Sequence, residues 1–295
     1  MDMQKHFQNT KKHSVIKFLF PLYPHHIFKS TKLMALIGTL IALRFIIGMF
    51  SITIPGVSIS ISITWVTDML MGWIYGPIYG FVLGAICDTI GYIASPTAVW
   101  FWMFAIQEPM VGFLSGVFGS FCAWRCVYKK NYLIDLLIQQ IVIISFVAIS
   151  LISILIWVDD KSIKLFNIYK WIVISMITIY LTVMEIFTYL NIKSIYDQKE
   201  RTLIFIYSTT LVMVAMIICS FLLGPISAIE YLKHINGEYP ESYMKYGTIF
   251  YLIPRVAKES IKSPLESIVL TSLIIITKPM IETYINEFQN KWVIF

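Results

Sequence analysis

Long runs of apolar residues separated by short polar stretches dominate the pattern along this chain. A helix needs about 20 residues to cross the roughly 30 Å of hydrocarbon in a bilayer. Gly76 and Pro77 alone separate the second run from the third, and they predict a tight turn. The pattern predicts an all-α integral membrane protein whose membrane helices lie at 33–50, 61–76, 78–94, 98–121, 132–157, 165–190, 202–224 and 249–279.

The composition agrees with a membrane protein. Of the 295 residues, 58% are hydrophobic and 14% are charged, whereas charged residues make up about 25% of a soluble domain. Nucleic-acid binding is one explanation for the net charge of +6. However, the basic residues lie mostly outside the apolar runs, where they act as topology signals. We therefore expect a lipid membrane around the chain and no nucleic-acid partner.

The basic residues also predict the orientation of the chain. They gather in the tail 1–32, and in the stretches 125–130 and 193–201 that follow the fourth and sixth runs. With eight crossings these three stretches share one side, which is cytoplasmic by the positive-inside rule. We expect a multi-pass protein of the cell membrane with both termini in the cytoplasm, and an outer loop at 225–248. The long tail without a small-residue cleavage site argues against a cleaved signal peptide.

Charged residues inside the apolar runs are the candidate chemistry. Each costs roughly 2.5–3.5 kcal/mol at a helix centre, so it should face protein or water. Arg44 lies about 18 Å along the helix from Lys32, in the outer half of the first run. It requires an anionic partner, and either Asp68 or a bound carboxylate would serve.

The stretch 252–270, LIPRVAKESIKSPLESIVL, carries five charges at the start of the last run. The apolar remainder, 265–277, would cover only about 20 Å as a helix. It cannot span alone, so the helix must begin upstream and take the charges into the membrane. Arg255, Lys258 and Lys262 then lie on one helical face.

Two interpretations of these charges remain open. In the first, Arg255 pairs with Glu259 and Lys262 with Glu266, each four residues apart. In the second, the basic face lines a polar cavity near the outer surface, and Pro264 breaks the helix just below it.

The sequence shows no catalytic or metal-binding motif. It contains no GxxxxGK[ST] phosphate loop, no HExxH and no nucleophile elbow. Cys122 and Cys126 form a C-x3-C pair, which is not a common zinc or redox spacing. We therefore expect no enzyme activity, no ATPase site, no cofactor and no metal.

Several motifs in order resemble one family of membrane proteins. They are Ala42-Leu43-Arg44, the stretch MGWIYGPIYG at 71–80, and Gly84, Asp88, Gly91 and Pro96 in the following run. Together they resemble the S components, or substrate-binding subunits, of energy-coupling-factor (ECF) vitamin transporters, most narrowly those of the folate family. The stretch 252–270 is similar to the last helix of that family.

The resemblance implies a six-helix S-component core with an inserted helical hairpin, about eight transmembrane helices in all. Because the similar residues lie on either side of the hairpin, we expect it to be dispensable for ligand binding. The expected division is a basic cytoplasmic tail at 1–32, helices 1–4 at 33–124, the hairpin at 125–201, helices 5–6 at 202–285 and a C-terminal tail at 286–295.

The resemblance also implies a function. An S component binds its vitamin from outside with high affinity, here most simply folate. It then associates with a transmembrane coupling subunit and two ABC ATPases, which supply the energy. Small residues let membrane helices approach closely, and the small residues of the first helix would face the coupling subunit; these are Ala35, Gly38, Thr39 and Ala42.

Folate chemistry suggests the contacts. A carboxylate would accept hydrogen bonds from the amino group and ring N–H of the pterin. Asp68 is the first candidate for this role and Asp88 the second. Tryptophans would stack on its flat ring, unless they form an interfacial aromatic belt, and basic side chains would hold the carboxylates of the tail. The candidate binding residues are Arg44, Trp65, Asp68, Trp100, Trp102, Arg255 and Lys258.

Two alternatives remain open at this point. The ligand of the S component would be another vitamin; if neutral, it would leave Arg44 and Arg255 to pair internally with Asp68 or Glu108. Alternatively, the chain is not a transporter but a membrane enzyme or assembly factor with intramembrane acid pairs.

Overall fold

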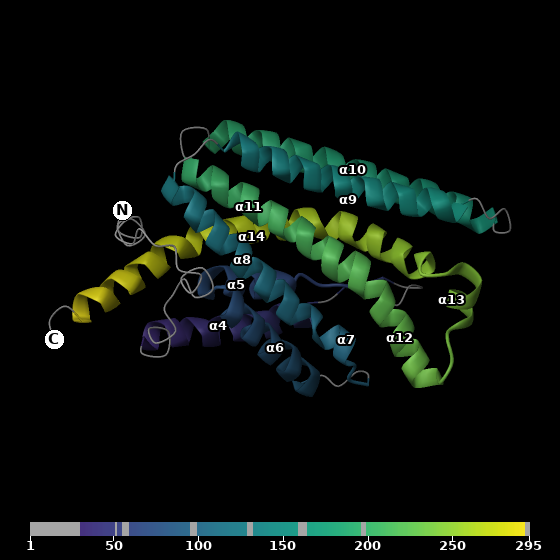
Figure 1. Ribbon diagram of the computed structural model, residues 1–295, viewed down its shortest axis with the longest axis horizontal. Helices are drawn as coiled ribbons and strands as arrows, with labels where there is room; N and C mark the ends of the chain where they lie inside the picture. Colours follow the sequence, from purple (N-terminus) through teal and green to yellow (C-terminus); the bar gives the residue numbers. More distant parts are fainter. Residues whose placement is uncertain are drawn as a thin grey trace.

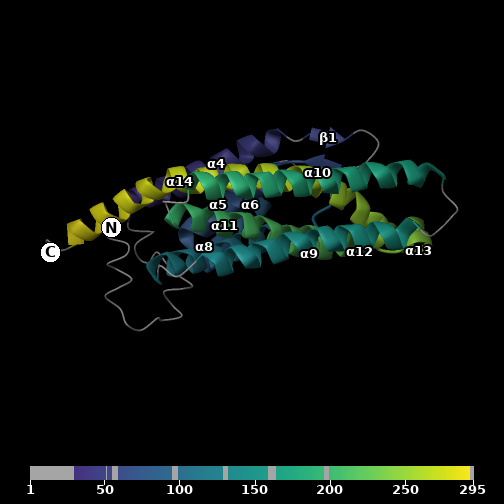
Figure 2. The same cartoon turned by 90° about the horizontal axis from the view of Figure 1, so that it is seen from above.

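The computed structural model describes residues 30–50, 52–54, 59–94, 99–128, 132–158, 164–195 and 199–292, so most of the basic tail lies outside the described residues. Long helices lie lengthwise beside one another (Figures 1 and 2). In chain order the elements are α4 (Thr31–Met49), β1 (Ile52–Ile54), β2 (Ile59–Ile61), α5 (Trp65–Tyr75), α6 (Pro77–Ala94), α7 (Trp102–Ala105), α8 (Gln107–Tyr128), α9 (Leu133–Val158), α10 (Lys164–Ile195), α11 (Lys199–Ala215), the π-helix η1 (Met216–Leu223), α12 (Gly224–Asn236), α13 (Glu241–Tyr246) and α14 (Ile249–Trp292).

The all-α membrane class is confirmed, and each expected run falls on a helix. By length and apolar composition, four described segments are able to cross a membrane: Thr31–Met49, Leu133–Ile152, Glu200–Asn236 and Phe250–Thr283. Shorter apolar helices cover Pro77–Ile93 and Ile174–Leu190. The 11-residue α5 is only about 16 Å long, so it does not reach across the hydrocarbon by itself.

Several expected boundaries were wrong. The fourth run does not begin as a helix at residue 98, because the short α7 precedes α8. The expected outer loop 225–248 contains α12 and α13, and the first outer loop contains an antiparallel pair in which Ile52 faces Ile61. These polar or β-branched segments lack the long apolar pattern on which the prediction relied.

Pro264 does not break α14, contrary to the prediction. The helix runs through Pro254, Pro264 and Pro279 and continues into the expected tail as far as Trp292. A proline removes one backbone donor, and within a membrane bundle neighbouring groups satisfy the freed carbonyl, so the helix tolerates it.

Glycines bring α5, α6 and α8 into close contact. A methyl group at Gly72 would lie 2.1 Å from the carbonyl oxygen of Gly112, and one at Gly116 would lie 2.2 Å from the nitrogen of Pro77. The turn between α5 and α6 uses Gly76 at φ 91°, a backbone conformation that glycine adopts without strain. The predicted Gly-Pro turn is confirmed, and it is part of this tightly packed unit.

The expected hairpin is present as α9 and α10, which run along one side of the molecule (Figure 1). Its helices pack on α11 and α14. Gln139 of α9 donates a hydrogen bond to Thr209 of α11, and the ring of Phe146 stacks on Phe221 with centroids 5.0 Å apart. The hairpin therefore contributes to the protein core, and its dispensability for ligand binding stays a prediction.

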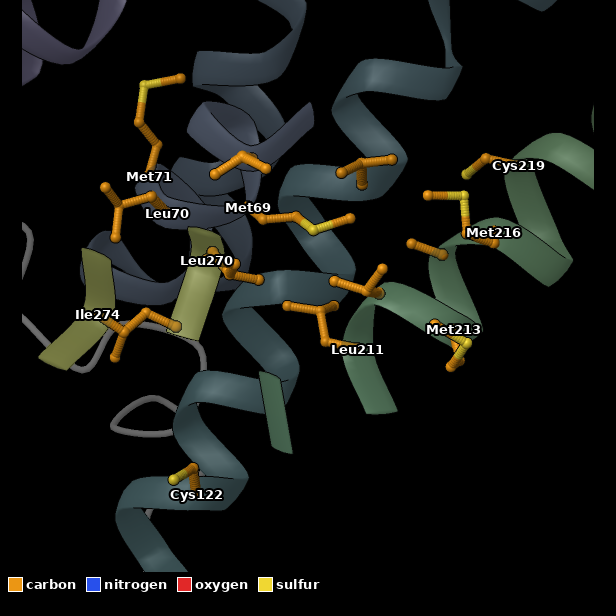
Figure 3. Packing of buried hydrophobic residues seen from close by; sticks show 14 of the residues in the cluster. Met69, Leu70, Met71, Cys122, Leu211, Met213, Met216, Cys219, Leu270 and Ile274 are labelled. Atoms are coloured by element: carbon orange, nitrogen blue, oxygen red, sulfur yellow. The ribbon is translucent and has the colours of Figure 1, made fainter. Parts of the chain in front are cut away.

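Apolar side chains of α5, α8, α11, η1 and α14 fill the centre of the molecule (Figure 3). Met69, Leu211, Met216 and Leu270 are at most 1% exposed and come from separate elements. Burial of this cluster fixes the positions of α5 and α14, which carry Asp68 and the charges of 252–270, and of η1, which packs beside them.

Candidate functional site

A buried cation joins α4, α5 and α8. The Arg44 guanidinium donates to Glu108, and its Nε lies 3.5 Å from Oδ1 of Asp68. The side chains of Arg44 and Asp68 are 9% and 0% exposed. Arg44 thus has the anionic partner that its depth required, and that partner lies within the protein. Whether Arg44 also contacts a ligand stays a prediction.

Asp68 has unused hydrogen-bonding capacity. Both of its carboxylate oxygens are buried, and neither accepts a hydrogen bond within the described part of the chain. A buried carboxylate without hydrogen bonds is costly. A ligand that presents N–H groups to Asp68 would offset this cost. Asp88 is only partly buried, which makes it the weaker candidate.

The α14 charges adjoin Asp68. Lys262 Nζ lies 3.2 Å from Oε1 of Glu266 and 4.1 Å from the centroid of the Trp65 ring. Trp65 precedes Asp68 by three residues on α5, so the Lys262 contact lies about one helical turn from Asp68. The start of α5 thus connects the Arg44 cluster with the α14 cluster.

The second i, i+4 pair expected in α14 is not formed. Arg255 and Lys258 are partly buried, yet among the described residues neither makes an ion pair within 4 Å. Glu259 instead accepts a hydrogen bond of 2.8 Å from Ser220 of η1. The self-paired interpretation therefore holds for Lys262 with Glu266 and not for Arg255 with Glu259, which leaves two cations available for an anion.

The tryptophans predicted to stack on a ligand occupy different settings. Trp65 packs under Lys262, whereas Trp100 and Trp102 are 52% and 58% exposed. Phe101, between them in sequence, packs against Tyr231 with centroids 5.8 Å apart. The exposure of Trp100 and Trp102 favours the interfacial-belt alternative, and only Trp65 lies beside the buried charges.

The small residues of α4 form an exposed face. Ala35, Gly38, Thr39 and Ala42 are all exposed, while the buried residues of this helix include Leu33 and Arg44. A methyl group added at Gly38 would meet nothing within 4 Å. The face thus has room for another helix and points away from the Arg44 cluster.

Comparison with known families now decides the class of this protein. The family described as "ECF-type riboflavin transporter, S component" matches residues 28–197. The chain belongs to this family of S components. It is therefore a subunit of a vitamin transporter, and the matched range includes α4 to α10.

Relatives of this S component fall into two groups. It is 31% identical over 290 residues to "Uncharacterized protein MG313" of Mycoplasma genitalium and 29% identical over 287 residues to its homolog in Mycoplasma pneumoniae. Each alignment covers 93% of this chain and 99% of the relative. The "Folate transporter FolT" of Streptococcus mutans is 32% identical over 110 residues, 36% of this chain and 59% of that protein. No solved structure matches the chain at a significant level.

Two residues of the candidate site had no assigned role in the sequence prediction. Ser220 and Gly224 carry no charge and sit within an apolar run, so no local signal marks them. Glu108 was recognised as an intramembrane charge and as an internal partner, and the structure pairs it with Arg44. A pairing between residues 64 positions apart depends on the tertiary packing of α4 and α8.

Proposed function

We propose that this S component binds a folate-type vitamin from outside the cell and delivers it inward with a coupling subunit and two ABC ATPases. The observation that carries the proposal is the combination of Arg255 and Lys258, which form no ion pair within 4 Å among the described residues, with Asp68, a buried carboxylate that accepts no hydrogen bond from those residues. Asp68 matches the pterin end of a folate, which is rich in N–H donors. Arg255 and Lys258 match the anionic glutamate end.

The free oxygens of Asp68 suit a pterin. The pterin edge presents an amino group and a ring N–H side by side, and a carboxylate accepts both as charge-assisted hydrogen bonds. Trp65 adjoins Asp68 on α5 and supplies an aromatic face, on which a flat ring packs favourably.

The free cations suit the glutamate tail. Arg255 and Lys258 lie one helical turn apart near the start of α14, so both are within reach of one ligand end. A partly buried cation is stabilised by a carboxylate, and the guanidinium group binds carboxylates in bidentate geometry. Arg44 forms ion pairs with Glu108 and Asp68, and Lys262 forms one with Glu266, so we propose a structural role for both.

Riboflavin is the second candidate, because the matched family is described as riboflavin transporters. Riboflavin has no carboxylate, so it would leave Arg255 and Lys258 without counter-ions. The similarity to a folate transporter and the two free cations both favour folate.

Ligand affinity of the purified full-length protein tests the proposal. Folate should bind more tightly than pteroic acid, which lacks the glutamate, and more tightly than riboflavin. Arg255→Ala should weaken folate binding by about tenfold to a hundredfold, the loss expected for a charge-assisted hydrogen bond, and should weaken pteroic acid much less. The matched control is Lys278→Ala. Lys278 lies further along α14 and pairs with Glu200 of α11. Tighter binding of riboflavin, or equal losses for folate and pteroic acid, would overturn the assignment.

For the partners and orientation, we propose that the α4 face of Ala35, Gly38, Thr39 and Ala42 contacts the coupling subunit and that both termini are cytoplasmic. The exposure of this face supports the contact with the coupling subunit. The distribution of basic residues supports the cytoplasmic position of both termini.

A further inference from the structure

The π-helix η1 and the residue after it bring two residues into contact with the charged end of α14. It joins α11 to α12 and is followed at once by Gly224. Runs of π-helix are rare and occur often at functional sites, because the wider turn changes which side chains face a neighbour. Ser220 and Gly224, one turn apart, both face α14: Ser220 contacts Glu259, and Gly224 lies against Arg255.

Ser220 forms a hydrogen bond with Glu259, the acidic residue best placed along the helix to pair with Arg255. Arg255 and Glu259 have the i, i+4 spacing that favours an ion pair on a helix. However, Oε1 of Glu259 accepts a hydrogen bond of 2.8 Å from the Ser220 hydroxyl, and Oε2 of Glu259 is buried and accepts none from the described residues. Ser220 and Glu259 are 3% and 1% exposed, so water does not compete for this contact.

Gly224 provides the space in which the Arg255 guanidinium lies. A methyl group at position 224 would be 2.4 Å from Nη1 of Arg255 and 2.7 Å from Cζ. Both distances are far shorter than van der Waals contact, so any residue other than glycine would force the guanidinium to move. The side chain would then turn from α12 toward other groups on α14, of which Glu259 lies one turn away.

We propose that Ser220 and Gly224 are positioning residues that keep Arg255 apart from Glu259 and so reserve its positive charge for a ligand carboxylate. This inference rests on the anion site described under the proposed function. An Arg255 paired with Glu259 would have to break that ion pair before it could bind a ligand. The hydroxyl at 220 holds the competing carboxylate, and the missing side chain at 224 gives the guanidinium another place.

The inference predicts effects that depend on ligand charge. Ser220→Ala frees Glu259 to attract Arg255, and Gly224→Ala pushes Arg255 away from α12. Each change should lower folate affinity by about tenfold, the equivalent of losing one charge-assisted hydrogen bond, and should lower pteroic acid affinity far less. Ser220→Thr keeps the hydroxyl and should restore most of the folate affinity.

A double-mutant cycle decides between positioning and simple packing. Folate and pteroic acid affinities are measured for Ser220→Ala and Gly224→Ala, each in the native protein and in the Arg255→Ala variant, with melting temperatures for all. A positioning role predicts that neither change lowers folate affinity further once Arg255 is absent. Should Ser220→Ala not fold, Gly224→Ala carries the same comparison, because it moves Arg255 without altering Ser220.

Two results would overturn the inference in distinguishable ways. If Arg255→Ala lowers folate affinity selectively, but Ser220→Ala and Gly224→Ala lower affinity for both ligands equally with or without Arg255, the anion site stands and positioning fails. If Arg255→Ala has no ligand-selective effect, the anion site of the proposed function fails, and the inference fails with it.

Discussion

Arg44 of α4 donates a hydrogen bond to Glu108 of α8, which lies 64 positions later in the chain. The buried residues of α4 are Leu33, Leu40 and Arg44, so this contact is one of few that hold the helix to the bundle. The opposite face of α4 is the exposed small-residue face. The ion pair thus fixes the helix that we propose to contact the coupling subunit.

Arg44→Ala should destabilise the protein without its ligand. Breaking a buried pair leaves Glu108 and Asp68 as uncompensated charges, which costs about 3–5 kcal/mol. The measurement is thermal unfolding of the purified protein in detergent, with Arg255→Ala as the comparison, because Arg255 has no ion-pair partner among the described residues. A ligand-free melting temperature that falls as much for Arg255→Ala as for Arg44→Ala would contradict the structural assignment of Arg44.

Lys262→Met should be more harmful than removal of the whole pair. The single change leaves Glu266, whose side chain is 0% exposed, as an unpaired charge in the core, whereas the double change to Lys262→Met and Glu266→Leu replaces a buried pair with apolar groups. We expect the single variant to lose about 3–5 kcal/mol and the double variant to recover most of it. Unfolding curves that show additive losses would argue against a direct interaction between these side chains.

Phe146→Ala should destabilise the protein through the hairpin. Phe146 is 0% exposed and packs on Tyr180 and Phe221 with ring centroids 4.8 and 5.0 Å away. Its truncation should cost about 3–5 kcal/mol, as for other buried aromatic residues. Ile144→Ala is the matched control, since Ile144 on the same helix is 60% exposed. Equal melting temperatures for the two variants would show that α9 is a peripheral helix.

Gly38→Leu should impair vitamin uptake and complex assembly while leaving the ligand affinity of the isolated subunit nearly unchanged. A β-carbon added at Gly38 has no described atom within 4 Å, whereas a leucine there blocks the close approach of a partner helix. Ala42→Leu should act in the same way. Gly72→Leu provides the contrast, because its side chain would collide with the Gly112 backbone and should prevent folding. Normal uptake by the Gly38 and Ala42 variants would place the partner surface elsewhere.

The sequence was sufficient for features that depend on local pattern. Gly76 and Pro77 predicted the turn, and the short apolar remainder after Leu265 predicted that the charges of 252–262 belong to the helix. The depth of Arg44 predicted an anionic partner for it. Each of these follows from helix geometry and the cost of charge in hydrocarbon, which need no tertiary information.

The remaining features depend on packing between distant segments. The register of α11 relative to α14 decides whether Ser220 meets Glu259, and the π-helix that sets this register occurs in an apolar run without a breaker residue. Arg255 and Glu259 have the spacing of an ion pair, so the sequence alone could not decide between this pair and a ligand-facing Arg255, which depends on the tertiary contact between Ser220 and Glu259.

The length of α14 has a mechanical consequence. Its 44 residues extend about 66 Å, twice the roughly 30 Å of a hydrocarbon core, and its C-terminal end projects past the other helices (Figure 1). From Arg255 to Trp292 the helix is a lever of about 56 Å, so a tilt of about 5° at the charged end moves the other end by about 5 Å. If the ligand binds at the charged end as proposed, a tilt of this size would carry the rearrangement to the far end of the helix, where a partner subunit would detect it.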